Sequence, residues 1–112
     1  MFKIGIDLDH CINSNERTIE FFSAFTAAFS ELGAFIYIIT NREPGSEKEV
    51  QAELDQLDIV WHQIEITAEK AKFIIDRGIT IYFDDTDEYF LDLPESVCVF
   101  KIREEGNFDF NH

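Results

Sequence analysis

The chain has 112 residues, of which 46% are apolar and 14% aromatic, and its formal net charge at pH 7 is −14. A chain of this length builds one domain around a single core, and none of its apolar runs approaches the roughly 20 residues that cross a bilayer. The acidic excess disfavours nucleic acid and anionic membrane surfaces as partners. Because no leader pattern precedes the first strand, we expect a cytoplasmic protein. From the chain length we expect a single domain over residues 1–112.

Apolar runs and helical patterns alternate along the chain. Continuous apolar runs predict strands at 2–8, 34–39, 59–61, 79–83 and 97–101. Helical periodicity predicts helices at about 13–32, 46–57 and 67–78, and a short helix or turn at 86–91. Such alternation forms a mainly parallel sheet through right-handed crossovers, with helices on both faces. The expected class is therefore α/β, a Rossmann-like three-layer sandwich, followed by a loosely held, flexible tail at 104–112.

The first predicted helix carries a wide apolar stripe. Its members are Ile19, Phe21, Phe22, Phe25, Phe29 and Leu32. Most of the stripe is expected to pack against the sheet. Because the stripe is wider than one sheet contact requires, its edge at Phe21 is a candidate subunit contact, and a homo-oligomer is one expectation.

Charged and hydroxyl side chains stand where predicted strands end or a helix begins. They are Asp7 and Asp9 after the first strand, Thr40, Asn41 and Arg42 after the second, Lys70 and Lys72 at a helix start, and Asp84 and Asp85 after the fourth strand. Open parallel sheets gather their ligands at these carboxyl ends. An aspartate pair after one strand is often only a solvated turn, so it is the combination of four segments that predicts a site.

The first aspartate pair suits phosphoryl transfer, which needs an oxygen nucleophile, positive charge around the transferred oxygens and a proton for the leaving group. Asp7 offers a carboxylate that needs no base to activate it. Asp9, two residues further along an extended chain, is expected to point to the same side. There it can protonate the leaving oxygen and later deprotonate water. The alternative for Asp9 is a turn cap.

The second acidic pair predicts a metal. Asp84 and Asp85 would bring two more carboxylates toward Asp7, and such a convergence of like charges is costly without a cation. Oxygen ligands of this kind suit Mg²⁺, which also accepts a backbone carbonyl such as that of Asp9. We expect Asp7 and Asp84 to bind the ion directly, with Asp85 behind Asp84 or as the alternate ligand.

The residues after the second strand have several interpretations. The Thr40 hydroxyl and the Asn41 amide are expected to hold a phosphate oxygen, although strands often end in threonine for other reasons. Arg42 either reaches the substrate or is a surface arginine facing acidic neighbours.

Two lysines compete for one role, the neutralisation of the transferred phosphate. Lys70 lies in the first turn of the helix that Thr67 is expected to cap. Lys72, two residues further along, is turned toward another face of the helix. We therefore favour Lys70 and keep Lys72 as the alternative.

At these four segments the sequence resembles the haloacid dehalogenase (HAD) superfamily of phosphotransferases. The resemblance covers nearly the whole chain and implies a Rossmann-like sheet with strand order 5-4-1-2-3, Mg²⁺ as cofactor, and hydrolysis through a phosphoaspartate. The roles that it implies are nucleophile for Asp7, acid/base for Asp9, phosphate binder for Thr40, charge clamp for a lysine and metal ligand for Asp84.

Two features depart from the pattern of that family. Many members carry Gly and then Thr or Val after the second aspartate, whereas His10 and Cys11 stand here. His10 either contacts substrate or assists proton transfer, or it points to solvent. The connections after Asp9 and Thr40 are too short for a cap domain, so a capless member is expected.

Cys11 and Cys98 lack metal or redox spacing and are expected to be reduced thiols, Cys98 in a buried strand.

Three functions compete. The first is a Mg²⁺-dependent phosphate monoester hydrolase of unknown substrate, either a small molecule or a macromolecule. Retention of Asp9 favours this over the dehalogenase branch, whose members lack it. The second is a non-catalytic HAD-fold protein that binds phosphate or metal. The third is a response-regulator receiver, which the order of the motifs disfavours because a receiver's phosphorylated aspartate follows its third strand.

Overall fold

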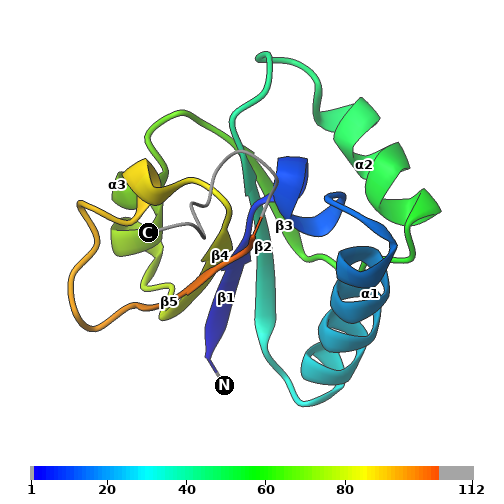
Figure 1. Ribbon diagram of the computed structural model, residues 1–112, viewed down its shortest axis with the longest axis horizontal. Coiled ribbons are helices and arrows are strands. Elements are labelled where there is room, and N and C mark those ends of the chain that lie inside the picture. The colour runs from blue at the N-terminus through cyan, green and yellow to red at the C-terminus, as the bar shows by residue number, and fades with distance from the viewer. Residues whose placement is uncertain (1, 104–112) are drawn as a thin grey trace, which may run out of the picture.

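The computed structural model describes residues 2–103, which form a parallel sheet of five strands with helices on both faces (Figure 1). The elements in chain order are β1 (Lys3–Ile6), the helical turn η1 (Leu8–Ile12), α1 (Glu16–Glu31), β2 (Phe35–Thr40), α2 (Glu47–Gln56), β3 (Gln63–Ile66), α3 (Lys70–Arg77), β4 (Ile81–Asp84), the short helix η2 (Asp87–Tyr89) and β5 (Cys98–Lys101). The expected α/β class is confirmed. The tail expected at 104–112 lies outside the described residues.

The strand order places the first strand in the middle of the sheet. Across the sheet the order is β3-β2-β1-β4-β5, and every neighbouring pair is parallel. Counted from the opposite edge, the same order reads 5-4-1-2-3. Because β1 lies between β2 and β4, the residues that follow these three strands meet at one edge of the sheet.

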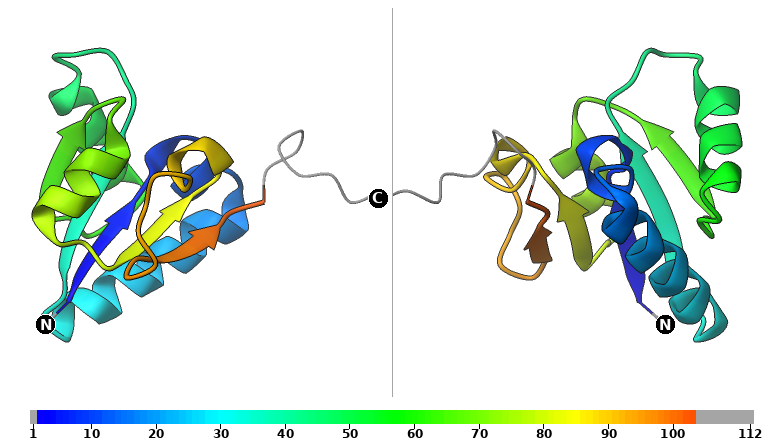
Figure 2. Two further views of the ribbon diagram at one scale, coloured as in Figure 1. Left: turned by 90° about the vertical axis from the view of Figure 1, so that its left-hand side faces the viewer. Right: turned by 45° about the vertical axis from the view of Figure 1, so that its right-hand side comes forward.

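Helices cover the two faces of the sheet unequally. α1 and α2 lie on one face and α3 lies on the other (Figures 1 and 2). The core under α1 and α2 includes Ile4, Ile6, Phe22, Ile36, Ile38, Val50 and Leu54. The core under α3 includes Tyr37, Ile39, Ile74, Ile79 and Tyr82. Successive residues of β2 enter opposite cores, which explains why a strand buried on both faces reads as a continuous apolar run.

The third strand lies further along the chain than predicted. The segment 59–61 is not a strand, and β3 is Gln63–Ile66, paired with Tyr37–Thr40. The apolar side chains at 59–61 mislead because Ile59 and Trp61 pack into the core below α2 without joining the sheet. β3 is an edge strand that is only partly buried, so polar and apolar residues alternate in it instead of forming an apolar run.

Gly5 allows the central strand to lie close to a tyrosine that shapes the site. A Cβ atom at Gly5 would lie 2.9 Å from Cδ1 of Ile39 and 3.1 Å from Cδ1 of Tyr82, closer than such contacts normally come. The absence of a side chain therefore lets the Tyr82 ring pack across β1, and the Tyr82 hydroxyl donates a hydrogen bond to Asp84.

The start of α3 differs from the prediction in a way that matters for Lys70. Thr67 does not cap the helix, because Glu69 is the capping position and Lys70 is the first helical residue. The Thr67 hydroxyl accepts a hydrogen bond from the N–H of Glu69 at 3.0 Å, which orders the segment leading into the helix. Gly78 ends α3 in the left-handed conformation, as its position in the sequence predicted.

Several apolar side chains predicted to be buried are not. In the stripe of α1, Phe22 is fully buried, whereas Leu32 is 60% exposed. Phe21, which the sequence placed at the edge of the stripe, is 51% exposed. Cys98 is exposed because β5 is an edge strand, while Cys11 is buried, and burial raises the pKa of its thiol. Within residues 2–103, no helix has both the length and the apolar character needed to span a membrane.

Candidate active site

Asp7 follows β1 and is fixed by the neighbouring strand. Its N–H donates to the carbonyl of Phe83 at 3.0 Å, and the residue is only 5% exposed. Leu8 then begins the turn η1, in which Asp9 keeps extended backbone angles and His10 lies in the left-handed region with φ 59°. The chain therefore turns directly after Asp7, and the simple extended geometry expected between the two aspartates is absent.

The carboxyl ends of the strands enclose a small cavity of about 170 Å³. Its lining residues are Asp7, Asp9, His10, Thr40, Asn41, Lys70, Asp85, Thr86 and Tyr89. The lining does not include three other residues that the sequence predicted for the site, which are Arg42, Lys72 and Asp84. The lining also includes Thr86 and Tyr89, which the sequence predicted only as part of a short helix or turn at 86–91.

Lys70 reaches the centre of the site. Its Nζ atom lies 3.0 Å from Oδ1 of Asp7 and 3.1 Å from Oδ2 of Asp84, and its side chain is 2% exposed. Lys72 instead pairs with Asp76 at 3.0 Å on the surface of α3, with 71% of its side chain exposed. Of the two candidate lysines, the structure brings only Lys70 to the aspartates.

The ionisation of Asp7 and Lys70 is coupled. Burial raises the pKa of Asp7 to about 8; the charge of Lys70 opposes this rise and that of Asp84 adds to it. Burial also lowers the pKa of Lys70, but the carboxylates of Asp7 and Asp84 outweigh it, and the net pKa lies above the ordinary value of 10.5. Lys70 therefore stays protonated at neutral pH, and one lysine does not supply enough positive charge to ionise Asp7 fully.

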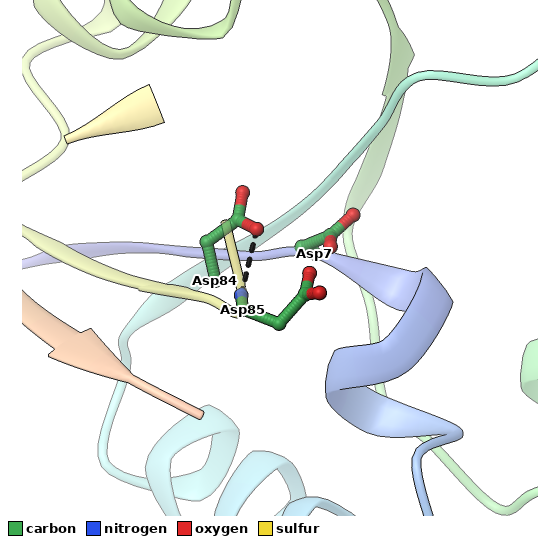
Figure 3. A group of neighbouring side chains, drawn as sticks. All are labelled: Asp7, Asp84 and Asp85. Atoms are coloured by element: carbon green, nitrogen blue, oxygen red, sulfur yellow. Dashed lines mark hydrogen bonds between the residues drawn. The ribbon is translucent and has the colours of Figure 1, made fainter. Parts of the chain in front are cut away.

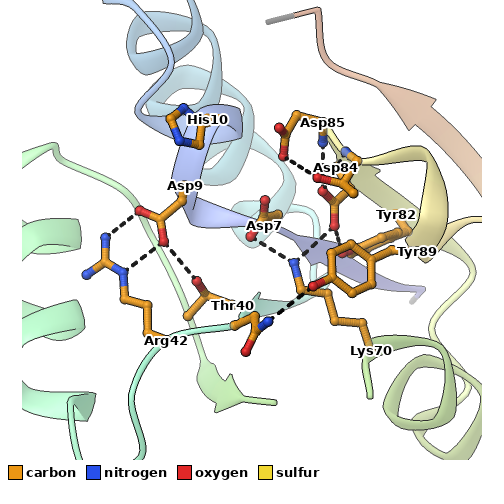
Figure 4. A network of polar contacts seen from close by, with 12 residues as sticks. Asp7, Asp9, His10, Thr40, Arg42, Lys70, Tyr82, Asp84, Asp85 and Tyr89 are labelled. Atoms are coloured by element: carbon orange, nitrogen blue, oxygen red, sulfur yellow. Dashed lines mark hydrogen bonds and ion pairs between the residues drawn. The ribbon is translucent and has the colours of Figure 1, made fainter. Parts of the chain in front are cut away.

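Asp84 is fully buried and accepts hydrogen bonds from four donors. Oδ1 accepts from the N–H groups of Asp85 at 2.7 Å and Thr86 at 3.0 Å. Oδ2 accepts from Lys70 at 3.1 Å and from the hydroxyl of Tyr82. A carboxylate has about four acceptor positions, so the whole capacity of Asp84 is used in holding Lys70 and the start of the following loop (Figure 4).

Asp85 is the carboxylate of the acidic pair that lines the cavity. One oxygen from each of Asp7, Asp84 and Asp85 lies within 4.8 Å of the others (Figure 3). Oδ1 of Asp85 also accepts from the Thr86 hydroxyl at 3.3 Å. Buried carboxylates packed this closely fit a hard divalent ion such as Mg²⁺, which prefers oxygen ligands. Of these three aspartates, Asp7 and Asp85 line the cavity and Asp84 does not.

Tyr89 closes one side of the site. Its ring lies over Nζ of Lys70, with 4.2 Å between that atom and the ring centroid. Its hydroxyl accepts a hydrogen bond from the side chain of Asn41 at 3.3 Å. Asn41 and Tyr89 thus connect the loop after β2 to η2 across the cavity. Thr40 is fully buried, and its hydroxyl points toward Oδ2 of Asp9 at 3.5 Å.

Arg42 lies beside Asp9. The arginine donates from Nε to Oδ2 of Asp9 at 3.0 Å and from Nη2 to Oδ1 at 2.7 Å. Nη2 also contacts Oε2 of Glu53 in α2 at 2.7 Å. These hydrogen bonds to Arg42 hold the pKa of Asp9 below its ordinary value. Acidic neighbours for Arg42 were one of the two interpretations that the sequence allowed, and neither named Asp9 as the partner.

Comparison of the chain with protein-family models, with curated proteins and with solved structures finds no match. The structure itself shows an α/β fold with a parallel, Rossmann-like sheet.

Proposed function

We propose that the protein is a Mg²⁺-dependent phosphate monoester hydrolase that acts through an aspartyl-phosphate intermediate. The observation that carries this proposal is the buried group at the carboxyl ends of β1 and β4, in which Lys70 bridges Asp7 and Asp84 while Asp85 faces the same cavity. A buried carboxylate next to a lysine and to further carboxylates is suited to attack phosphorus in the presence of a divalent ion.

The chemistry has two steps. In the first, a carboxylate oxygen of Asp7 forms a bond to phosphorus, the ester P–O bond breaks, and the leaving oxygen takes a proton from Asp9. Asp9 must therefore bind that proton when the anionic substrate is in place, because the contacts with Arg42 hold its pKa below the ordinary value in the free protein. In the second, water attacks phosphorus, its proton passes to Asp9, and inorganic phosphate leaves as Asp7 is regenerated. Asp9 is therefore an acid in one step and a base in the other, and a positioned group of this kind contributes about 10²–10⁴ in rate.

Three side chains would bind the phosphoryl group. The Lys70 ammonium, the Thr40 hydroxyl and the Asn41 amide all line the cavity and offer donors to the transferred oxygens. A Mg²⁺ ion held by Asp7 and Asp85 would add the positive charge that ionises Asp7 and neutralises the phosphoryl oxygens. The cavity of about 170 Å³ suits a phosphoryl group, so most of a leaving group would lie outside it.

The deciding experiment is a panel of small phosphate monoesters and phosphopeptides, assayed for phosphate release with Mg²⁺ and with EDTA. We expect Mg²⁺-dependent release by the wild type and none by Asp7→Asn, while the melting temperature shows that both proteins fold. Trifluoroberyllate, which mimics an acyl phosphate, should bind the wild type but not Asp7→Asn. Hydrolysis retained within a few fold in Asp7→Asn would exclude the aspartyl-phosphate mechanism.

A further inference from the structure

The sequence left two interpretations of Arg42, a contact with substrate or a surface charge, and the structure indicates a third. Arg42 follows β2, and its guanidinium group contacts Asp9 of η1 (Figure 4). The same group contacts Glu53 of α2. It lies on the side of Asp9 away from Lys70. Asp9 and Glu53 already neutralise its charge, so the guanidinium group is poorly suited to capture an anionic substrate.

The contact with Asp9 restricts the orientation of the carboxylate. A guanidinium group that donates two parallel hydrogen bonds fixes both the position and the plane of its carboxylate partner, which a single ammonium contact does not do. The remaining acceptor positions of Asp9 face the Thr40 hydroxyl at 3.5 Å and the Asn13 amide at 3.4 Å. Asp9 is thus held from three directions, and Arg42 makes the two shortest contacts.

Glu53 fixes the arginine in turn. Its Oε2 atom lies 2.7 Å from Nη2 of Arg42, the same nitrogen that donates to Oδ1 of Asp9. The side chains of Arg42 and Glu53 are 23% and 36% exposed, so the pair is partly shielded from water. The helix α2, which provides no residue of the cavity lining, is thereby connected to the orientation of Asp9.

We propose that Arg42 is a positioning residue, which holds the Asp9 carboxylate at the place where it gives a proton to the leaving oxygen and later takes one from the attacking water. This inference rests on the proposed hydrolase function. The Asp9 side chain is 40% exposed, so without the arginine it would sample other orientations in water. A displacement of about 1 Å in a catalytic group costs up to about 10²-fold in rate.

The test compares Arg42→Ala, Arg42→Lys and a surface control on the best ester of the wild-type panel. Arg42→Ala should lower kcat by about 10- to 100-fold and change KM less than threefold, because Asp9 takes part in proton transfer and not in substrate binding. Arg42→Lys should recover only part of kcat, since an ammonium group lacks the two parallel donors. Arg17→Ala removes the same charge from an exposed position in α1 and should match the wild type.

Chemical rescue separates positioning from a fold defect. Guanidinium chloride at millimolar concentration should raise kcat of Arg42→Ala but not of the wild type, and equal sodium chloride should have no effect. Glu53→Gln should lower kcat by a smaller factor than Arg42→Ala, because the arginine keeps its contacts with Asp9. Melting temperatures show that each variant folds.

The outcomes distinguish this inference from the proposed function. A wild type that hydrolyses esters together with an Arg42→Ala variant of equal kcat overturns the positioning role alone. A large rise in KM with unchanged kcat also overturns it, because the arginine would then bind substrate. A wild type without Mg²⁺-dependent hydrolysis overturns the proposed function and this inference with it.

Discussion

The ring of Tyr89 covers the ammonium group of Lys70, whose Nζ atom lies 4.2 Å from the ring centroid. This contact helps to explain why Lys70 is only 2% exposed. A cation over an aromatic face is stabilised by about 0.5–2 kcal/mol, with the larger values where water is excluded. Tyr89 therefore acts as a local cover for the charge that faces the nucleophile.

Removing this cover should weaken catalysis. Tyr89→Ala should expose Lys70 to water, raise the rate at which acetic anhydride modifies it, and lower kcat by about 10-fold, because electrostatic stabilisation weakens in a wet site. Tyr89→Phe keeps the ring and loses only the hydrogen bond from Asn41, so its kcat should fall less than threefold. Peptide mass spectrometry and steady-state kinetics measure the two effects. Equal modification of Lys70 in all three proteins would contradict the role of Tyr89.

The two lysines of α3 provide a matched pair for a second prediction. Lys70→Met should lose at least ~10²-fold in kcat, because it removes the charge between Asp7 and Asp84. Lys72→Met removes an exposed pair with Asp76 and should remain within twofold of the wild type. Steady-state kinetics on one ester measures both variants. The reverse ranking would move the phosphate-binding role to Lys72.

The metal prediction separates the two aspartates that follow β4. Mg²⁺ at 100 times its dissociation constant should stabilise the wild type by about 2.7 kcal/mol, which corresponds to several degrees in melting temperature. Asp85→Asn should abolish this shift. Asp84→Asn should lower the metal-free melting temperature, because Lys70 loses a buried partner, yet retain a response to Mg²⁺. A response lost in Asp84→Asn and kept in Asp85→Asn would assign the direct ligand to Asp84, as the sequence alone predicted.

The sequence was informative wherever a residue's role depends on the end of a strand. Asp7 and Thr40 follow buried apolar runs, and the ends of neighbouring parallel strands meet whatever the details of the loops. After β4 the sequence favoured Asp84 as the direct metal ligand, whereas Asp85 is the aspartate that lines the cavity. Lys70 was predictable for a related reason, since it lies at the start of the helix that leads into β4. These features require only the strand order and the polarity of the residues that follow.

Side chains that cross between elements were not predictable in the same way. The pairing of Asp9 with Arg42 depends on the turn at η1, and no local pattern identifies that turn. Tyr89 reaches Lys70 from a short helix whose sequence is mainly acidic. β3 was misplaced because burial of Ile59 in the core resembles burial in a strand. In each case contacts between distant parts of the chain determine where the side chain or strand lies. A local pattern in one sequence carries no information about such contacts.

The stability of the metal-free protein should fall as pH rises from about 5 to 8. Asp7 has an ordinary pKa of 3.8 and a folded pKa of about 8, so over this window the folded state binds a proton that the unfolded state has lost. Stability falls with pH wherever the folded state binds more protons, with a slope of up to about 1.4 kcal/mol per pH unit for one proton. Lys70 contributes outside this window, because its folded pKa lies above 10.5 and its stabilisation is lost only at higher pH.

Asp7→Asn is the control for that prediction, since asparagine does not titrate. The difference in free energy of unfolding between wild type and Asp7→Asn, measured in urea with EDTA at several pH values, isolates the contribution of this one group. Saturating Mg²⁺ should flatten the pH dependence of the wild type, because the bound ion favours the ionised carboxylate. A difference that does not change between pH 5 and 8 would contradict the raised pKa of Asp7.

His10 allows backbone strain and side-chain function to be measured separately. Its φ of 59° lies in the left-handed region, which costs a non-glycine residue about 1–2 kcal/mol and costs glycine little. Many members of the family that the motifs resemble carry glycine at this position. His10→Ala removes the ring and keeps the strain, whereas His10→Gly removes both. We therefore expect His10→Gly to be more stable than His10→Ala by about 1 kcal/mol, measured by urea unfolding.

If the ring assists catalysis at the cavity that it lines, both variants should lose kcat to the same extent. Equal stability of the two variants would show that the turn relaxes around residue 10, and a loss of kcat in His10→Gly alone would assign the effect to the backbone of η1 and not to the imidazole.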